Sequence, residues 1–275
     1  MAKAPKAPWR VAILTMVPSF VGDLAVAVRA AGHEPAVVIT ARTPSLQADA
    51  FLSEDTDGVD VVVAAGRRSL APILRGYDID LGLCAGFPWR IPQVAIDAPK
   101  LGIVNGHIGM LPRYRGPHPV AWAVRNGETE IGMTYHFMDA DFDTGNVLAQ
   151  AAVPLGEEDD WPSTVAKLHE AGNELLPRVF ERLARGDSGE PQGDGEYQTA
   201  FEDSYAVLDT AATAADVHRQ VRAWSFVPPG PRVGPILERN GGRRRIARTS
   251  LSKVPGAEQL DCADAPIWIL DSEPA

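Results

Sequence analysis

Short apolar runs alternate with helical patterns along the first part of the chain. Residues 10–16 and 34–40 are continuous apolar runs of strand length, and residues 20–31 between them carry apolar side chains at helical spacing. Continuous apolar runs are typical of parallel strands that are buried on both faces. A strand, a helix and a second strand within about thirty residues make a βαβ unit, so the pattern predicts a doubly wound α/β fold.

The same alternation continues to about residue 155. Further buried strands are predicted at 59–64, at 79–84 and at the run that ends with Val104, and two alternating stretches read as paired strands. Helices are predicted where apolar residues recur at helical spacing. The paired strands are 131–139 and 147–155, and the helices are 70–74 and 117–125.

The remaining residues predict a long helix, a linker and a small second domain. Asp160 to Ser163 has the composition of a helix cap, which predicts a helix over 164–185, and residues 186–195 are rich in Gly, Asp and Pro. Beyond them the pattern predicts a helix at 214–224, a hairpin turn at 240–242 and a strand at 267–270. We therefore predict a main domain over 1–187, a linker over 188–203 and a C-terminal domain over 204–275. The fold class is α/β, a Rossmann-like domain with a small α+β or all-β appendage.

Composition narrows the class of protein. The net charge of −10 argues against broad nucleic-acid binding. Cys84 and Cys262 are too few for a disulfide framework and fit a reducing compartment. The first apolar run is too short for a membrane span or a signal peptide. We expect a soluble cytoplasmic protein that makes no membrane contact.

The turn after the first strand argues against one common cofactor. It reads Leu14 to Phe20 without the Gly-x-Gly-x-x-Gly pattern that holds a pyrophosphate. A dinucleotide at this turn is therefore disfavoured.

Polar residues with acid–base chemistry gather between residues 105 and 143. Asn105 and His107 lie two residues apart at a strand end, so both side chains point to the same side. Asp139, Asp141 and Asp143 follow in one polar loop. An amide, an imidazole and a carboxylate are the parts of an acid–base site. An alternative interpretation is that Asn105 and His107 only cap the strand end.

Several spaced motifs together resemble the N10-formyltetrahydrofolate-dependent formyltransferases. The resemblance is dense from about Asp80 to Gln150 and weaker through the 203–223 segment. One departure is Gly109, where the family commonly carries Ser. The motif residues are Asn105-x-His107, Leu111-Pro112-x-Tyr114-Arg115-Gly116, Pro119 with Trp122, Met138-Asp139 and Asp143-Thr144-Gly145.

The resemblance implies roles for individual residues. It makes 1–187 the catalytic domain, with Asn105, His107 and Asp143 as the catalytic trio. The formyl donor, N10-formyltetrahydrofolate, would be held by two loops, largely through their backbone, and no metal is expected. The donor-binding residues would be Phe87, Arg90, Ile91, Pro92, Asp139, Ala140 and Asp141, and the acceptor-binding residues Arg113, Tyr114, Arg115 and Gly116.

Several other features have simpler interpretations. The spacing of Asp139 to Asp143 matches the start of a calcium loop, but Gln150 occupies the twelfth position, where Glu is required. We interpret Cys84 as a buried structural thiol and His136 as a structural residue on its strand. The arginine cluster at 243–248 is either a solvated hairpin face or a patch that binds an anionic acceptor or a carrier protein.

The distribution of charge along the sequence indicates the class of formyl acceptor. A tRNA-formylating enzyme is expected to carry a basic loop after the second strand and a full basic second domain, whereas residues 41–55 hold a single arginine and the tail is short. We therefore favour a small-molecule amine and disfavour tRNA. Two alternative functions remain. The first is another enzymatic activity, either methionyl-tRNA formylation or formyltetrahydrofolate hydrolysis. The second is folate binding without catalysis. A hydrolase should carry a domain before the first strand, and a non-catalytic module should lack a trio member. A homodimer stays open.

Overall fold

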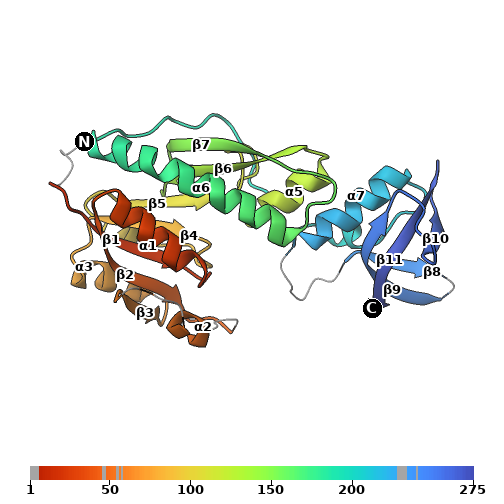
Figure 1. Cartoon of the computed structure of the whole chain (residues 1–275), viewed down its shortest axis with the longest axis horizontal. Coiled ribbons are helices and arrows are strands. Elements are labelled where there is room, and N and C mark those ends of the chain that lie inside the picture. Colours follow the sequence, from red (N-terminus) through yellow and green to blue (C-terminus); the bar gives the residue numbers. More distant parts are fainter. Residues whose placement is uncertain (1–5, 45–47, 54–55, 57, 228–233, 240) are drawn as a thin grey trace. The chain divides into compact units, whose positions relative to one another are not determined.

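The larger sheet of the computed structural model has seven strands (Figure 1), and the model describes residues 6–44, 48–53, 56, 58–227, 234–239 and 241–275. The strand order is β3-β2-β1-β4-β5-β6-β7. The first five are parallel, and β6 runs antiparallel to β5. The strands are β1 (Arg10–Thr15), β2 (Glu34–Ala41), β3 (Asp60–Ala64), β4 (Leu81–Ala85), β5 (Ile103–His107), β6 (Glu130–Phe137) and β7 (Val147–Pro154).

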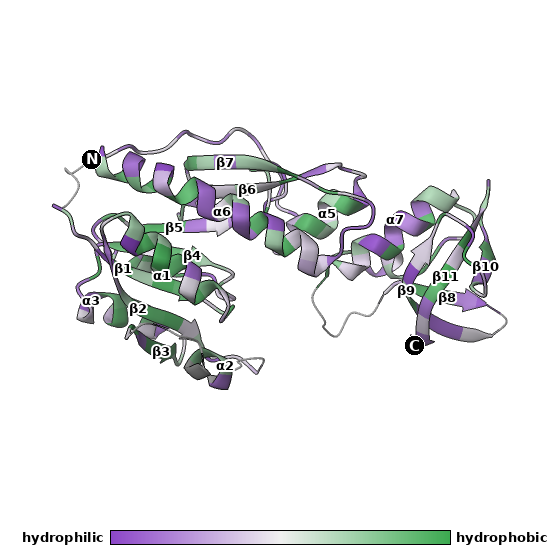
Figure 2. Ribbon diagram, in the orientation of Figure 1, coloured by the Kyte–Doolittle hydropathy of each residue, from purple (hydrophilic) through white to green (hydrophobic). Residues whose placement is uncertain are grey.

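The helices and short turns between these strands follow the predicted alternation. Strands β1, β2 and β4 are almost fully buried, which explains their continuous apolar runs, and Figure 2 shows them as hydrophobic ribbons. The predicted fold class is therefore confirmed. The helices are α1 (Phe20–Ala30), α2 (Ala48–Ser53), α3 (Leu70–Gly76), α4 (Gln93–Ile96), α5 (Pro119–Arg125) and α6 (Trp161–Ala184), with a 3₁₀ turn η1 at Arg67–Ser69.

The start of α6 shows the predicted cap. The Asp160 carboxylate accepts from the Ser163 backbone N–H at 2.9 Å, and the Ser163 hydroxyl accepts from the Asp160 backbone N–H at 3.1 Å. This reciprocal pair satisfies two donors that a helix start leaves free. The helix begins at Trp161, three residues before the predicted start.

The chain divides into two compact units that are not contiguous in sequence. The first contains residues 1–115, 132–153 and 166–196, and the second contains 116–131, 154–165 and 197–275. The predicted boundaries at 187 and 203 stay a prediction.

The second unit has a core of its own. Helix α7 (Ala214–Ser225) packs against α5 and on a four-stranded sheet of order β10-β11-β9-β8. Val217, Val221, Ile246 and Ile267 are almost completely buried in this core. Its remaining elements are the 3₁₀ turn η2 (Asp203–Ala206), β8 (Ile236–Arg239), β9 (Gly242–Ser250), β10 (Glu258–Asp261) and β11 (Pro266–Pro274).

Some elements were not predicted. Helices α2 and α4 are only one or two turns long, and β10 buries Leu260 alone among its four residues, so none shows a clear apolar period. Strands β8 and β9 form the predicted hairpin, whose turn residue Asn240 lies outside the described residues. No helix in the part of the chain that the structure describes is long and apolar enough to cross a membrane.

Candidate active site

The candidate trio lies where β5 ends. Ligands of open α/β sheets bind beyond the carboxyl ends of the strands, and Asn105 and His107 occupy that end of β5. Asn105 is registered opposite His136 on the antiparallel strand β6. The polar loop that follows β6 brings Asp143 to His107, so a residue distant in sequence joins the two at the end of β5.

The His107 imidazole is buried between the Tyr114 carbonyl and the Asp143 carboxylate. Nε2 lies 2.8 Å from the carbonyl oxygen of Tyr114, and Nδ1 lies 3.6 Å from Oδ1 of Asp143. A carbonyl only accepts, so Nε2 must carry the proton. In the neutral ring Nδ1 is therefore the free base, and it faces the carboxylate.

Burial is the largest influence on the basicity of His107. Desolvation lowers the pKa of the imidazole below its ordinary value, and the neighbouring His136 acts in the same direction, while Asp143 and the Tyr114 carbonyl oppose them. The imidazole is thus neutral near pH 7, the form that can accept a proton.

His136 is a member of the site that the sequence interpretation missed. Its Nδ1 lies 2.8 Å from the Phe137 carbonyl oxygen and therefore carries the proton. Its Nε2 then accepts from the Asn105 amide nitrogen at 3.2 Å, and it lies 3.6 Å from Oδ1 of Asp143. Since the Asn105 NH₂ group has a second N–H, that donor remains available to a ligand. Only the β5–β6 register, which the sequence does not give, could have revealed this contact.

The two residues that hold His107 both have unusual backbone conformations. Tyr114 has φ 63° and Asp143 has φ 58°, and Asp78 is the one further non-glycine residue with positive φ in the described part of the chain. The left-handed region costs energy for residues with a Cβ. The fold therefore stores backbone strain at the two residues on either side of this imidazole.

Cys84 has the predicted structural role. The thiol is buried on β4, and burial raises the pKa of the thiol to about 12. A thiol in that state supplies almost no thiolate at neutral pH and is a poor nucleophile.

The two predicted donor-binding loops touch each other through Arg90. Its guanidinium donates to the Ala140 carbonyl, lies 3.7 Å from the Asp141 carboxylate and sits over the Phe142 ring at 5.6 Å. The second loop is braced internally, because Asp139 accepts from the Asp141 backbone N–H and the Thr144 hydroxyl.

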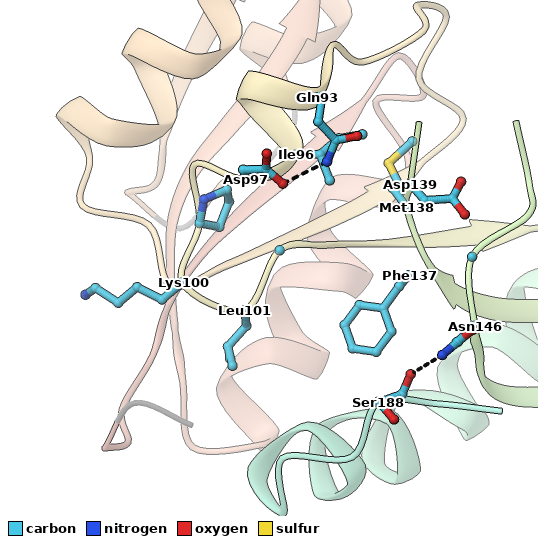
Figure 3. Close-up of a pocket in the computed structure, with 13 residues that line it drawn as sticks. Gln93, Ile96, Asp97, Lys100, Leu101, Phe137, Met138, Asp139, Asn146 and Ser188 are labelled. Carbon is cyan, nitrogen blue, oxygen red and sulfur yellow. Dashed lines mark hydrogen bonds between the residues drawn. The ribbon is translucent and has the colours of Figure 1, made fainter. Parts of the chain in front are cut away.

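Two cavities flank the segment Met138–Asp139. A small one of about 30 Å³ is lined by Ile91, His136 and Asp143, together with Arg90 and the 138–142 segment, and it has room for about one water molecule. A larger cavity of about 550 Å³ is also lined by this segment (Figure 3), and its volume is in the range of small-molecule sites. Gln93, Asp97, Leu101, Phe137 and Met138 are among the residues that line it.

Of the seven predicted donor residues, five line the small cavity: Arg90, Ile91, Asp139, Ala140 and Asp141. Phe87 packs edge-on against Trp89 at 5.7 Å, and Pro92 forms the N-cap of α4. Neither of these two lines either cavity.

The four predicted acceptor residues have diverse surroundings. The Tyr114 ring is buried under the Arg113 guanidinium at 5.5 Å, and Tyr114 uses its carbonyl to hold His107. Arg115 donates to Gln192 and to the carbonyls of Gly193 and Gly195. Gly116 approaches the Gln198 carbonyl so closely that a Cβ would lie 2.1 Å from it. Their role in acceptor binding stays a prediction.

The C-terminal arginine cluster is largely paired within its sheet. Arg243, Arg244 and Arg245 form ion pairs with Glu238, Glu258 and Glu273 at 2.8–3.0 Å. These pairs favour the interpretation of the cluster as a solvated hairpin face.

Among the described residues no group of three or more His, Cys, Asp or Glu side chains could hold a metal ion.

Comparison with known sequences identifies the central part of the chain. Residues 63–180 match the family model described as formyl transferase. A methionyl-tRNA formyltransferase from Pelobacter propionicus is 33% identical over 193 residues, which cover 69% of this chain and 57% of that protein. One from Citrifermentans bemidjiense is 36% identical over 158 residues, covering 56% of this chain and 50% of that protein. The chain thus spans about half the length of these relatives.

Solved structures share the fold. HypX from Aquifex aeolicus in complex with tetrahydrofolic acid superposes with a TM-score of 0.69 at 18% identity, over 98% of this chain and 44% of that one. A sugar N-formyltransferase from a Shewanella species gives a TM-score of 0.69 at 19% identity, over 90% of this chain and 100% of that one. The family model over residues 63–180 and the sequence relatives confirm the resemblance to the formyltransferases that the motifs predicted.

Proposed function

Because residues 63–180 form a formyl transferase domain, we propose that this chain transfers a formyl group from N10-formyltetrahydrofolate directly to an amine of a small molecule. The observation that carries the proposal is the convergence of an amide, an imidazole and a carboxylate beyond the end of β5. Asn105, His107 and Asp143 are the catalytic residues in this proposal.

The first step is attack of the acceptor amine on the formyl carbon. A new C–N bond forms and the carbonyl oxygen becomes an oxyanion. The free N–H of Asn105 stabilises that charge, an effect for which loss of one such donor typically costs about 10²–10³ in kcat. The amine proton passes to Nδ1 of His107, and the resulting imidazolium is stabilised by Asp143.

The second step is collapse of the tetrahedral intermediate. The bond between the former formyl carbon and N10 of the folate breaks, and the proton held by His107 is returned to N10. The products are tetrahydrofolate and the N-formylated acceptor, so no covalent enzyme intermediate is required. The buried Cys84 thiol is consistent with this direct route.

The donor site must change shape before the folate ring enters it. A cavity of about 30 Å³ cannot hold a bicyclic ring, so the loops joined by Arg90 have to part. The adjoining cavity of about 550 Å³ provides space of the size that such a ring and its substituents need. HypX from Aquifex aeolicus, a protein of similar fold, has been solved in complex with tetrahydrofolic acid, which supports a folate as the donor.

The charge of the protein supports a small molecule as the formyl acceptor. A net charge of −10 and ion-paired arginines in the C-terminal sheet disfavour a polyphosphate partner such as tRNA. An amino sugar nucleotide or a hydroxyornithine-type intermediate would suit a small-molecule site. The names of the sequence relatives favour a second candidate, methionyl-tRNA.

One experiment tests both candidates. The full chain is mixed with 10-formyltetrahydrofolate and either a panel of small amines or methionyl-tRNA, and release of tetrahydrofolate is followed while mass spectrometry identifies the product. We expect release with a small amine and a loss of about 10²–10⁴ in rate for His107→Ala. Release that no amine stimulates, with His107→Ala equal to the parent, would overturn the proposed function.

A further inference from the structure

We propose that Gln192, in the segment predicted as a linker, is a positioning residue that holds the loop carrying Asp143 in its working conformation. This inference rests on the proposed function, because it assigns Asp143 to the catalytic trio. The residues involved all belong to the first compact unit.

Gln192 contacts the loop that carries Asp143 through its amide nitrogen and Arg115 through its amide oxygen. Its amide nitrogen donates to the Asp143 carbonyl at 3.0 Å and to the Gly145 carbonyl at 2.7 Å. Its amide oxygen accepts from Nη2 of Arg115 at 2.9 Å and from Nε at 3.3 Å. One side chain thus links the Arg115 loop to the loop that carries the carboxylate.

The orientation of the Gln192 amide follows from its partners alone. A guanidinium only donates and backbone carbonyls only accept, so the amide oxygen must face Arg115 and the nitrogen must face the loop. Arg115 adds bonds to the carbonyls of Gly193 at 3.1 Å and Gly195 at 3.0 Å. The Arg115 guanidinium thus makes four hydrogen bonds, and its charge strengthens each of them. Arg115 therefore anchors the Gln192 side chain firmly.

The segment around Gln192 is fixed at both ends. Glu190 exchanges backbone hydrogen bonds with Val147, and Asn146 donates to the Ser188 carbonyl. At the other end Gly195 passes so close to the Pro112 carbonyl that a Cβ would lie 2.1 Å from the oxygen. Residues 188–195 therefore behave as a strap across the 143–147 loop rather than as a free linker.

The strap explains how an unfavourable conformation persists. Asp143 has φ 58° and Gly145 lies so close to Phe137 that a Cβ would meet its carbonyl oxygen at 1.9 Å. Strained residues keep their conformation only where the surroundings over-determine them. Gln192 binds the carbonyls of both residues, so its loss lets the loop relax and moves the carboxylate away from His107.

The test uses variants that remove the donor while keeping the size of the side chain. Gln192→Glu replaces the N–H donor with an oxygen that faces two carbonyls, and it retains an acceptor for Arg115. Arg115→Met removes the anchor. We expect each to lower kcat about 10- to 100-fold, as for a displacement of about 1 Å in a reacting group. In Gln192→Glu the KM for the amine should change less than threefold.

A readout without turnover separates this inference from the proposed function. The imidazole of His107 is followed by NMR as pH is varied in the parent and both variants. Asp143 raises and His136 lowers the pKa of His107, so withdrawal of Asp143 should move the midpoint to lower pH. Hydrogen exchange in residues 139–146 should also become faster.

The control is Asp194→Asn, which exchanges carboxylate and amide at an exposed neighbouring position and should match the parent in every readout. An unchanged His107 midpoint and unchanged exchange in Gln192→Glu would overturn the inference, whether or not any amine is formylated. If the midpoint moves but no acceptor supports turnover, the positioning role stands and the proposed function fails.

Discussion

Gly109 lies against the His107 imidazole with no space for a side chain. A Cβ there would be 2.6 Å from Nε2 of His107 and 2.9 Å from the Tyr114 carbonyl oxygen. Those two atoms form the hydrogen bond that fixes the tautomer of His107. The departure from the family motif at this position is therefore coupled to the placement of the imidazole.

This contact predicts the effect of Gly109→Ala. The new methyl group must push the imidazole away from Tyr114, so we expect kcat to fall about 10- to 100-fold. Steady-state kinetics of formyl transfer measure the change. Gly22→Ala is the matched control, because the Cβ meets nothing within 4 Å on helix α1 and should leave kcat unaltered. Equal activity of Gly109→Ala and the parent would contradict the assigned role of the Tyr114 carbonyl.

Some site residues could be predicted from sequence and others could not. Asn105 and His107 share one side of a strand, and spaced motifs drew attention to Asp143. His136 was interpreted as structural because it lies on an alternating strand. Its contact with Asn105 depends on the antiparallel register, which the sequence does not give. Gln192 was assigned to a linker because composition describes what a segment is made of and does not describe what it touches.

At the scale of elements, Arg90 joins the loop after β4 to the loop after β6. The contact is largely exposed, since the Arg90 side chain is 53% and the Asp141 side chain 81% accessible. Exposed pairs of this kind contribute about 1 kcal/mol or less. The loops can therefore part at small cost to admit the donor.

Arg90→Met tests this arrangement, since it keeps the length of the side chain and removes the link to Ala140 and Asp141. If the contact favours the closed state, its removal should lower the KM for the formyl donor by at most about fivefold. Initial rates at varied donor concentration measure this. An increase in KM would instead show that the guanidinium contacts the donor itself.

Some helices and strands could be predicted from the pattern of apolar residues, and others could not. The strands β1, β2 and β4 were predicted because burial on both faces leaves a continuous apolar run. The cap of α6 was predicted because Asp160 and Ser163 stand three residues apart. Helix α4 was missed, since four residues with a proline at the N-cap carry too little periodicity.

At the scale of the molecule, the two units interleave in sequence. Helix α5 comes from the middle of the chain and packs against α7, near the end, so residues 116–131 group with 197–275. Composition and turn residues mark boundaries along the chain only. A unit that collects separated segments is defined by packing, which the pattern of residues does not give.

Four buried or partly buried histidines make the stability of the fold depend on pH. Burial lowers the pKa of His33, His107, His118 and His218 below their ordinary value. His33 is stacked on Trp9 at 4.3 Å and accepts the Trp9 backbone N–H through Nδ1, which it cannot do once that nitrogen is protonated.

Such groups bind a proton more readily in the unfolded chain, so the folded state loses stability as pH falls below about 6.5 and is unaffected above that range. We expect the Tm to decrease by several degrees between pH 7.5 and 5.5, which differential scanning calorimetry measures. His33→Asn keeps an acceptor for Trp9 and removes one titrating group, so its Tm should decrease less over the same interval. A Tm that rises towards pH 5.5, or an equal slope in His33→Asn, would contradict this origin of the pH dependence.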